Sequence, residues 1–207
     1  MYKLYYSPGA CSMSVHVALN ECNQPVTLEK VDLANGKQRA PEFLAINPRG
    51  QIPVLVDGEV VLREGAAILI HVLEKHHSPL LPKEGAARAE ALEWLMFANA
   101  TLHPAYARAF FLKRGGVTEG PLMDAAAANI NKLWEEVDAR LATRAYICGD
   151  SVTVADILLT VIANWSGNVP RPIALGENTK RLLKEISARP SYQKALATEQ
   201  VEYKAAA

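Results

Sequence analysis

The first quarter of the chain alternates between short apolar runs and one stretch of helical periodicity. Residues 2–6 alternate weakly and are rich in tyrosine, which predicts a strand. Between residues 12 and 21 the apolar positions follow helical spacing. That spacing is carried by Val15, Ala18, Leu19 and Cys22. Residues 26–32 predict a second strand, and a β-α-β order of this length indicates two parallel strands joined by a right-handed crossover.

The pattern continues with a short helical turn at 41–44 and two further apolar runs, residues 52–56 and 59–62. Asp57 and Gly58 separate these runs, and Asp-Gly between strand-like runs is a strong hairpin signal because the turn needs positive φ. A helix is expected at 65–75. The predicted order of elements is βαβαββα, complete by about residue 76.

The remainder of the chain is helical after a proline-containing break. Residues 78–83 are expected to be a linker between a domain at 1–77 and an all-helical domain at 84–207. The predicted helices lie at 84–113, 121–142, 153–166, 178–188 and 191–200. Strands followed by a run of helices favour two domains, α/β first and all-α second.

Composition narrows the class of protein. Of the 207 residues, 50% are hydrophobic, which excludes a disordered chain. The 22 basic and 22 acidic residues give no net charge, so the chain lacks the basic excess that is typical of a nucleic-acid-binding protein. No apolar run approaches the ~18 residues of a membrane helix, and no signal-peptide core is present. Three cysteines without close-spaced pairs disfavour disulfides and a metal site and favour the cytoplasm.

Cys11 stands where the first strand passes into the first helix. The helix dipole and the unpaired N–H groups there favour a thiolate, so we expect the pKa of Cys11 below its free value of about 8.5. With Ser12, Met13 and Ser14 it forms Cys-x-x-Ser, which lacks the resolving cysteine of a redox motif. The alternative is a buried cysteine without chemistry. Cys22 and Cys148 are interpreted as packing residues.

Two other positions could hold a peptide-like ligand. Pro53 heads a strand-like run, and a cis Ile52–Pro53 bond would let the Ile52 backbone pair with an extended ligand. The alternative is a trans proline at a strand start. Glu64 and Gly65 precede a helix, where N–H groups suit a carboxylate and the Glu64 side chain suits an amine. The alternative is an ordinary acidic residue on a helix dipole.

Together these segments resemble a glutathione S-transferase, and the cysteine after Pro-Gly-Ala resembles the bacterial beta class. The segments are YSPGACS at 6–12, FLAINPRGQIPVL at 43–55, EGAAI at 64–68, EWL at 93–95 and GDSVTVAD at 149–156. The last resembles the family's N-capping box, in which Thr153 caps a helix and Asp156 reaches back to an unpaired N–H.

The resemblance implies a thioredoxin-like first domain, a helical second domain forming the electrophile side of a cleft, and glutathione as co-substrate. Residues implied in catalysis are Cys11, His103, Ser12 and Tyr6. Residues implied in glutathione binding are Cys11, Lys37, Ile52, Pro53, Glu64, Gly65, Asn99 and His103. His16, His71, His76 and His77 are not expected to bind a metal.

The chain departs from the family pattern at several positions. Gly65 stands where serine is common, Met96 where asparagine is usual, and Pro104 where lysine is usual. Asn99 lies four residues before His103 and can substitute for the missing asparagine. Proline at 104 is expected to bend the helix near residues 100–104.

Three functions are compatible with these residues. The first is conjugation of glutathione to small hydrophobic electrophiles, a detoxification reaction, accompanied by thiol–disulfide exchange at Cys11. The second is mainly a glutathione-dependent thiol–disulfide reductase, and the third is a catalytically weak binding protein for glutathione or apolar ligands. The resemblance also implies a cytoplasmic homodimer that needs no metal and binds neither nucleic acid nor a membrane.

Overall fold

The computed structural model describes residues 1–206 and divides into two compact units. The first consists of 1–83 together with 190–202, and the second of 84–189 with the segment that begins at Tyr203. The helical segment near residue 190 was expected in the second domain, and it packs in the first unit instead. Because no local pattern encodes the partner of an amphipathic helix, the sequence did not indicate this return.

A four-stranded sheet forms the centre of the first unit. Its strands are β1 (Tyr2–Tyr6), β2 (Val26–Lys30), β3 (Val54–Asp57) and β4 (Val60–Arg63), in the order β2-β1-β3-β4. β1 and β2 pair in parallel, as predicted, whereas β3 is antiparallel to both β1 and β4. The sheet is therefore mixed, and with the intervening helices it gives the expected thioredoxin-like βαβαββα order.

The predicted hairpin is confirmed with a turn one residue further along. Asp57 pairs with Val60, so Gly58 and Glu59 are the two central turn residues. Gly58 has a φ of +62°, and of these two residues it alone is at positive φ. A glycine at the first central position suits a two-residue hairpin, because it adopts this φ without a steric penalty.

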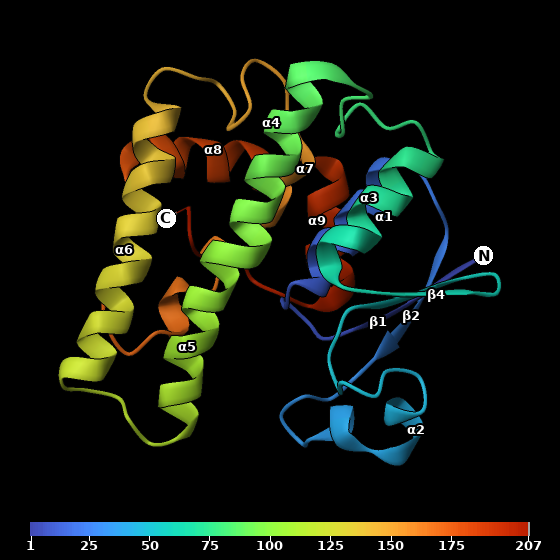
Figure 1. Ribbon diagram of the computed structural model, residues 1–207, viewed down its shortest axis with the longest axis horizontal. Helices are drawn as coiled ribbons and strands as arrows, with labels where there is room; N and C mark the ends of the chain where they lie inside the picture. The colour runs from blue at the N-terminus through green and yellow to red at the C-terminus, as the bar shows by residue number, and fades with distance from the viewer. Residues whose placement is uncertain (207) are drawn as a thin grey trace. The chain divides into compact units, whose positions relative to one another are not determined.

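Helices cover one face of the sheet, and a short helix covers the other (Figure 1). α1 (Ser12–Glu21) packs against both α3 (Gly65–Lys75) and α9 (Pro190–Glu199). On the opposite face, Phe43 of α2 (Pro41–Leu44) is buried in a small apolar cluster. The other members of that cluster are Val31, Val54, Tyr5, Ile46 and Ile52. The 3₁₀ turn η1 (Lys37–Arg39) precedes α2.

The second unit is entirely helical apart from an isolated bridge between Tyr146 and Gly149. Its elements are α4 (Gly85–Met96), η2 (Phe97–Leu102), α5 (His103–Arg114), α6 (Pro121–Leu141), α7 (Val154–Ala163), η3 (Ser166–Asn168) and α8 (Glu177–Ser187). All ten residues of α7 are buried, and α7 contacts α4 and α8, so it is the central helix of this unit. Within residues 1–206, no helix combines the length and the apolar character needed to cross a membrane.

The predicted irregularity before Pro104 is present as a π-helical segment. The six residues of η2 follow α4 directly, and α5 begins at His103 with Pro104 in its first turn. Proline has no N–H to donate to the preceding turn, and wider π turns accommodate such interruptions without ending the helix. The predicted 84–113 helix is therefore α4, η2 and α5 in succession.

The predicted capping box at the start of α7 is confirmed. The carboxylate of Asp156 accepts a hydrogen bond from the Thr153 backbone N–H at 2.7 Å and another from the Ile147 N–H at 2.8 Å. Asp156 is fully buried, and burial is the largest influence that raises its pKa. These bonds satisfy donors that the beginning of a helix would otherwise leave unpaired.

Candidate active site

The turn between β1 and α1 places Cys11 at the N-cap position of α1. Its thiol donates to the carbonyl oxygen of Ile52, with 3.8 Å between sulfur and oxygen. The peptide bond between Ile52 and Pro53 is cis, the isomer that the family resemblance implies, and not the trans form that is usual for a proline at a strand start. Cys11 and the backbone of Ile52, which are 41 positions apart in the sequence, are thereby brought together.

The protonation of Cys11 is opposite to the sequence prediction. Burial raises the pKa of the Cys11 thiol to about 11, and the charge of Glu64 adds to this effect. The backbone N–H groups of Ser12 and Cys11 at the start of α1 lower the pKa, as the helix argument supposed, but they are outweighed. At neutral pH the group is therefore a thiol rather than a thiolate.

Ser12 closes the turn rather than facing outward. Its side chain is fully buried, and its hydroxyl donates to the Ser7 carbonyl and accepts from the Ser7 N–H, each at 3.3 Å. Tyr6 is also buried, and burial together with the charge of Glu199 raises its pKa. Ser12 therefore braces the turn, and the catalytic role that the resemblance implies for it stays a prediction.

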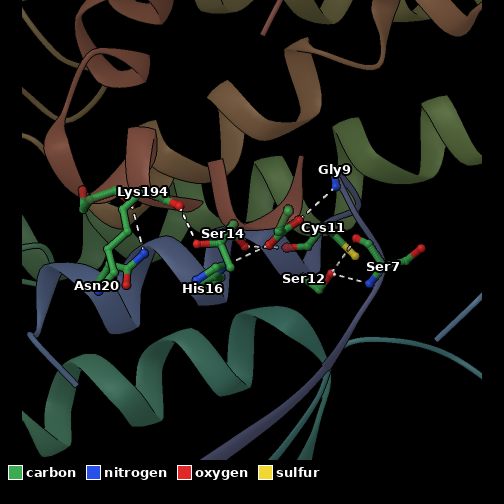
Figure 2. A network of polar contacts seen from close by, with 11 residues as sticks. Ser7, Gly9, Cys11, Ser12, Ser14, His16, Asn20 and Lys194 are labelled. Carbon is green, nitrogen blue, oxygen red and sulfur yellow. Dashed lines mark hydrogen bonds and ion pairs between the residues drawn. The ribbon is translucent and has the colours of Figure 1, made fainter. Parts of the chain in front are cut away.

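A buried acidic residue from the far end of the chain holds this turn, and nothing in the sequence pattern indicated it. Glu199, the last residue of α9, accepts hydrogen bonds from the backbone N–H of Gly9 at 3.0 Å and from Nδ1 of His16 at 2.9 Å. Figure 2 shows this network along α1, with Cys11 and Ser12 at one end and Asn20 toward the other. The structural role expected for His16 agrees with this contact.

Glu64 and Gly65 lie at the start of α3, as predicted. Glu64 has a φ of +75° and a ψ of 115°, an uncommon conformation for a residue with a side chain. Its carboxylate forms an ion pair with Arg49, with 2.5 Å between Nη1 and Oε1, and both side chains are about 60% exposed. Arg49 lies within the 43–55 segment, and no functional role was expected for it.

The remaining predicted site residues are divided between the two units. Lys37 is exposed at the start of η1 in the first unit. In the second unit, Asn99 is half-buried in η2 and His103 is half-buried at the start of α5. The His103 ring packs edge-on against Trp165 with 5.0 Å between ring centroids, and burial lowers its pKa, so His103 is neutral at pH 7.

No metal centre is evident in the part of the chain that the structure describes. Residues 1–206 contain no group of three or more His, Cys, Asp or Glu side chains that could hold an ion. The titratable groups gathered around the turn are instead Cys11, Tyr6, His16 and Glu199.

Two family models match the chain in succession. Residues 9–75 match the glutathione S-transferase N-terminal domain, and residues 72–190 match the glutathione S-transferase C-terminal domain. A glutathione S-transferase of Escherichia coli O157:H7, GstA, is 30% identical over 201 residues, which are 95% of this chain and 98% of that protein. The chain therefore belongs to the glutathione S-transferase family.

Solved structures agree with the sequence comparisons. The glutathione S-transferase of Xylella fastidiosa superposes with a TM-score of 0.86 at 29% identity, covering 98% of this chain and 100% of that one. A sphingomonad glutathione S-transferase complexed with glutathione gives a TM-score of 0.83 at 32% identity, covering 97% and 100%. The predicted fold class, a thioredoxin-like domain followed by a helical domain, is confirmed.

Proposed function

We propose that this protein is a glutathione transferase of the bacterial beta-class type that conjugates glutathione to small hydrophobic electrophiles. The observation that carries the proposal is the contact between the Cys11 thiol and the Ile52 carbonyl beside cis-Pro53, within the matched N-terminal domain. The backbone of half-buried Ile52 suits the cysteinyl part of glutathione, and Glu64 with the start of α3 suits its γ-glutamyl end.

The proposed chemistry uses the sulfur of bound glutathione as the nucleophile. The thiolate sulfur attacks the electrophilic carbon, a leaving group such as chloride departs with the bond electrons, and the thiol proton passes to solvent. The single S–H of Cys11 donates to the Ile52 carbonyl in the structure, and in the proposed reaction it turns to the sulfur of bound glutathione and stabilises the thiolate. His103 and Lys37 keep the supporting roles that the family resemblance implies.

The second candidate is a glutathione-dependent thiol–disulfide reductase with Cys11 as the attacking group. Disulfide exchange requires a thiolate, and a pKa of about 11 leaves very little thiolate at pH 7. The raised pKa therefore favours conjugation over reduction.

Cys11→Ala separates the two candidates. We expect conjugation of glutathione to an activated aryl halide to survive within about tenfold, or 1.4 kcal/mol, because Cys11 contributes only a hydrogen bond. Disulfide reduction by the wild-type protein is expected to be weak and to disappear in the variant. Strong reductase activity with little conjugation in the wild-type protein would favour the second candidate. A wild-type protein that shows neither conjugation nor disulfide reduction would refute the proposal.

The proposal includes a cytoplasmic homodimer. The groove between α5 and α6 is lined mainly by apolar side chains, and Phe111 and Leu122 in it are 71% and 66% exposed. Apolar surface of this kind on paired helices suits a second copy of the chain. Sedimentation equilibrium at micromolar concentration should give a mass near twice 22.6 kDa, and Phe111→Ser should shift the equilibrium toward the monomer.

A further inference from the structure

One crossing of the chain between the two units follows α9 directly. Residues 190–202 belong to the first unit, whereas Tyr203 and the described residues after it belong to the second. Residues 200–204 form a strap whose first part lies in one unit and whose last part lies in the other. Each part makes contacts within its own unit, at the end of α9 and at the end of α7. The strap therefore joins two helix ends covalently.

The first part of the strap ends α9 and borders the turn between β1 and α1. Gln200 has a φ of +56°, and the Val201 N–H donates back to the Leu196 carbonyl at 3.0 Å, as in a Schellman helix end. The Val201 side chain lies beside Gly9. Glu199, the last residue of α9, accepts from the N–H of the same glycine at 3.0 Å. One helix end thus supplies both a polar and an apolar contact to this turn.

The last part of the strap closes the C-terminal end of α7. The Tyr203 hydroxyl donates to the Thr160 carbonyl at 3.1 Å, and the Lys204 N–H donates to Oδ1 of Asn164 at 2.8 Å. Thr160 is in the last turn of α7, where carbonyl groups have no N–H partner within the helix. Burial raises the pKa of Tyr203, and the charge of Tyr106 adds to this effect, so the hydroxyl keeps its proton and remains a donor.

Both ends of the strap adjoin residues that the family resemblance implies in catalysis. Trp165 follows the C-cap of α7, and its ring packs against His103 with 5.0 Å between ring centroids. At the other end, the strap borders the turn that carries Cys11. Residues 201–202 separate the end of α9 from Tyr203. A displacement of one helix end is therefore passed to the other through a short length of backbone.

We propose that Tyr203 is a positioning residue for the reaction at Cys11. Anchored on α7, it keeps the end of α9 against the turn between β1 and α1, and it acts through Glu199 and Val201 rather than on the substrate. Without the anchor, the end of α9 would fray, and the turn would lose its Glu199 acceptor for part of the time. The inference rests on the proposed function and adds a residue of the second unit to those that hold Cys11 in place.

The test lengthens the strap without removing a contact. Insertion of Gly-Ser-Gly-Ser between the exposed Glu202 and Tyr203 keeps the partners of both ends and adds flexible chain between them. We expect alkylation of Cys11 by iodoacetamide at pH 8 to become about fivefold faster. We expect kcat/KM for conjugation of glutathione to an activated aryl halide to fall about tenfold. If Tyr203 served only to cap α7, neither rate would change, because the insertion keeps its bond to Thr160.

The same insertion between Lys83 and Glu84 is the matched control, because these exposed residues form another crossing between the same two units. It should leave both rates within twofold. Tyr203→Phe keeps the ring and loses only the hydroxyl, so it should change both rates in the same direction as the strap insertion but less. Far-UV circular dichroism should be unchanged in each variant.

Two results would overturn the inference alone. The insertion after Glu202 could leave both rates within twofold of wild type, or the two insertions could change them equally. If the strap insertion unfolds the protein, Tyr203→Phe decides, and rates equal to those of wild type would then count against the inference. A wild-type protein that conjugates no glutathione would instead refute the proposed function, and the alkylation rate of Cys11 would still show whether the strap holds the turn.

Discussion

The carboxylate of Glu199 accepts a hydrogen bond from the backbone N–H of Gly9 at 3.0 Å, although 190 positions separate the two residues in the sequence. The same carboxylate accepts from His16 at 2.9 Å, and its side chain is fully buried. One acid on α9 thus fixes both the turn that presents Cys11 and the helix that follows it. The Val201 side chain lies beside the same turn, 3.5 Å from where an added Cβ at position 9 would stand.

Removal of this carboxylate should destabilise the protein. Glu199→Ala removes the carboxylate that accepts from the half-buried Gly9 N–H and from the buried His16, and we expect a loss of about 2–4 kcal/mol in the free energy of unfolding. Glu199→Gln keeps one acceptor oxygen and should lose less. Urea denaturation measures both. Ser191→Ala, at the opposite end of α9 where Ser191 bonds Glu21, is the matched control and should lose under ~1.5 kcal/mol. An equal loss in Ser191→Ala and Glu199→Ala would mean that Glu199 has no special role.

The thiol of Cys11 should be a slow nucleophile at neutral pH. With its pKa raised to about 11 by burial, alkylation by iodoacetamide should be slower than that of a free cysteine at pH 7 and should keep increasing up to about pH 11. Mass spectrometry of the Cys11 peptide across pH 6–11 measures this profile. A reaction rate that levels off near pH 7 would show a lowered pKa and would restore the reductase candidate.

The buried carboxylate of Asp156 should be essential to the stability of the second unit. Asp156→Ala leaves the N–H groups of Thr153 and Ile147 without their acceptor, and we expect a loss of about 2–4 kcal/mol. Thermal unfolding followed by circular dichroism provides the measurement. Asp150→Ala, an exposed acid in the adjacent loop, serves as the control and should change stability by less than ~0.5 kcal/mol.

Asp57 should link stability to pH in the acidic range. Its carboxylate accepts from Lys75 at 2.5 Å and from His71 at 2.9 Å, and these bonds lower its pKa below the usual 3.8. A lowered folded-state pKa stabilises the protein above pH 3.8, and this contribution disappears as pH falls through the folded-state value. Wild type should therefore exceed Asp57→Asn in unfolding free energy at pH 6, and the difference should shrink below pH 3.8. A difference independent of pH would exclude this linkage.

Local sequence patterns predicted most of the fold because the periodicity of a strand or a helix depends only on residues that are close together in the sequence. The succession of strands and helices, the hairpin at Gly58, the capping box of Asp156 and the irregularity before Pro104 all follow from residues that are close together in the sequence. The docking of α9 on α1 depends on residues at opposite ends of the chain, so no periodicity revealed it.

The candidate site was predictable to a similar degree. Motif resemblance pointed to Cys11, Pro53 and Glu64, whose roles stay predictions, and the structure brings the Cys11 thiol against the Ile52 carbonyl beside Pro53. The direction of the Cys11 pKa shift was wrong because the sequence displays the helix start but not the burial of the sulfur. The pairing of Arg49 with Glu64 escaped detection because it depends on how a turn folds beside α3.

The return of α9 to the first unit has a consequence for synthesis on the ribosome. β1 and α1 emerge long before α9, so the turn between them lacks the Glu199 acceptor until α9 has been translated. A nascent chain that ends before residue 190 would expose the face of α1 that α9 covers. The first unit is therefore not completed until residues 84–189 of the second unit have been translated, and the Cys11 turn should stay sensitive to proteolysis until α9 has left the exit tunnel.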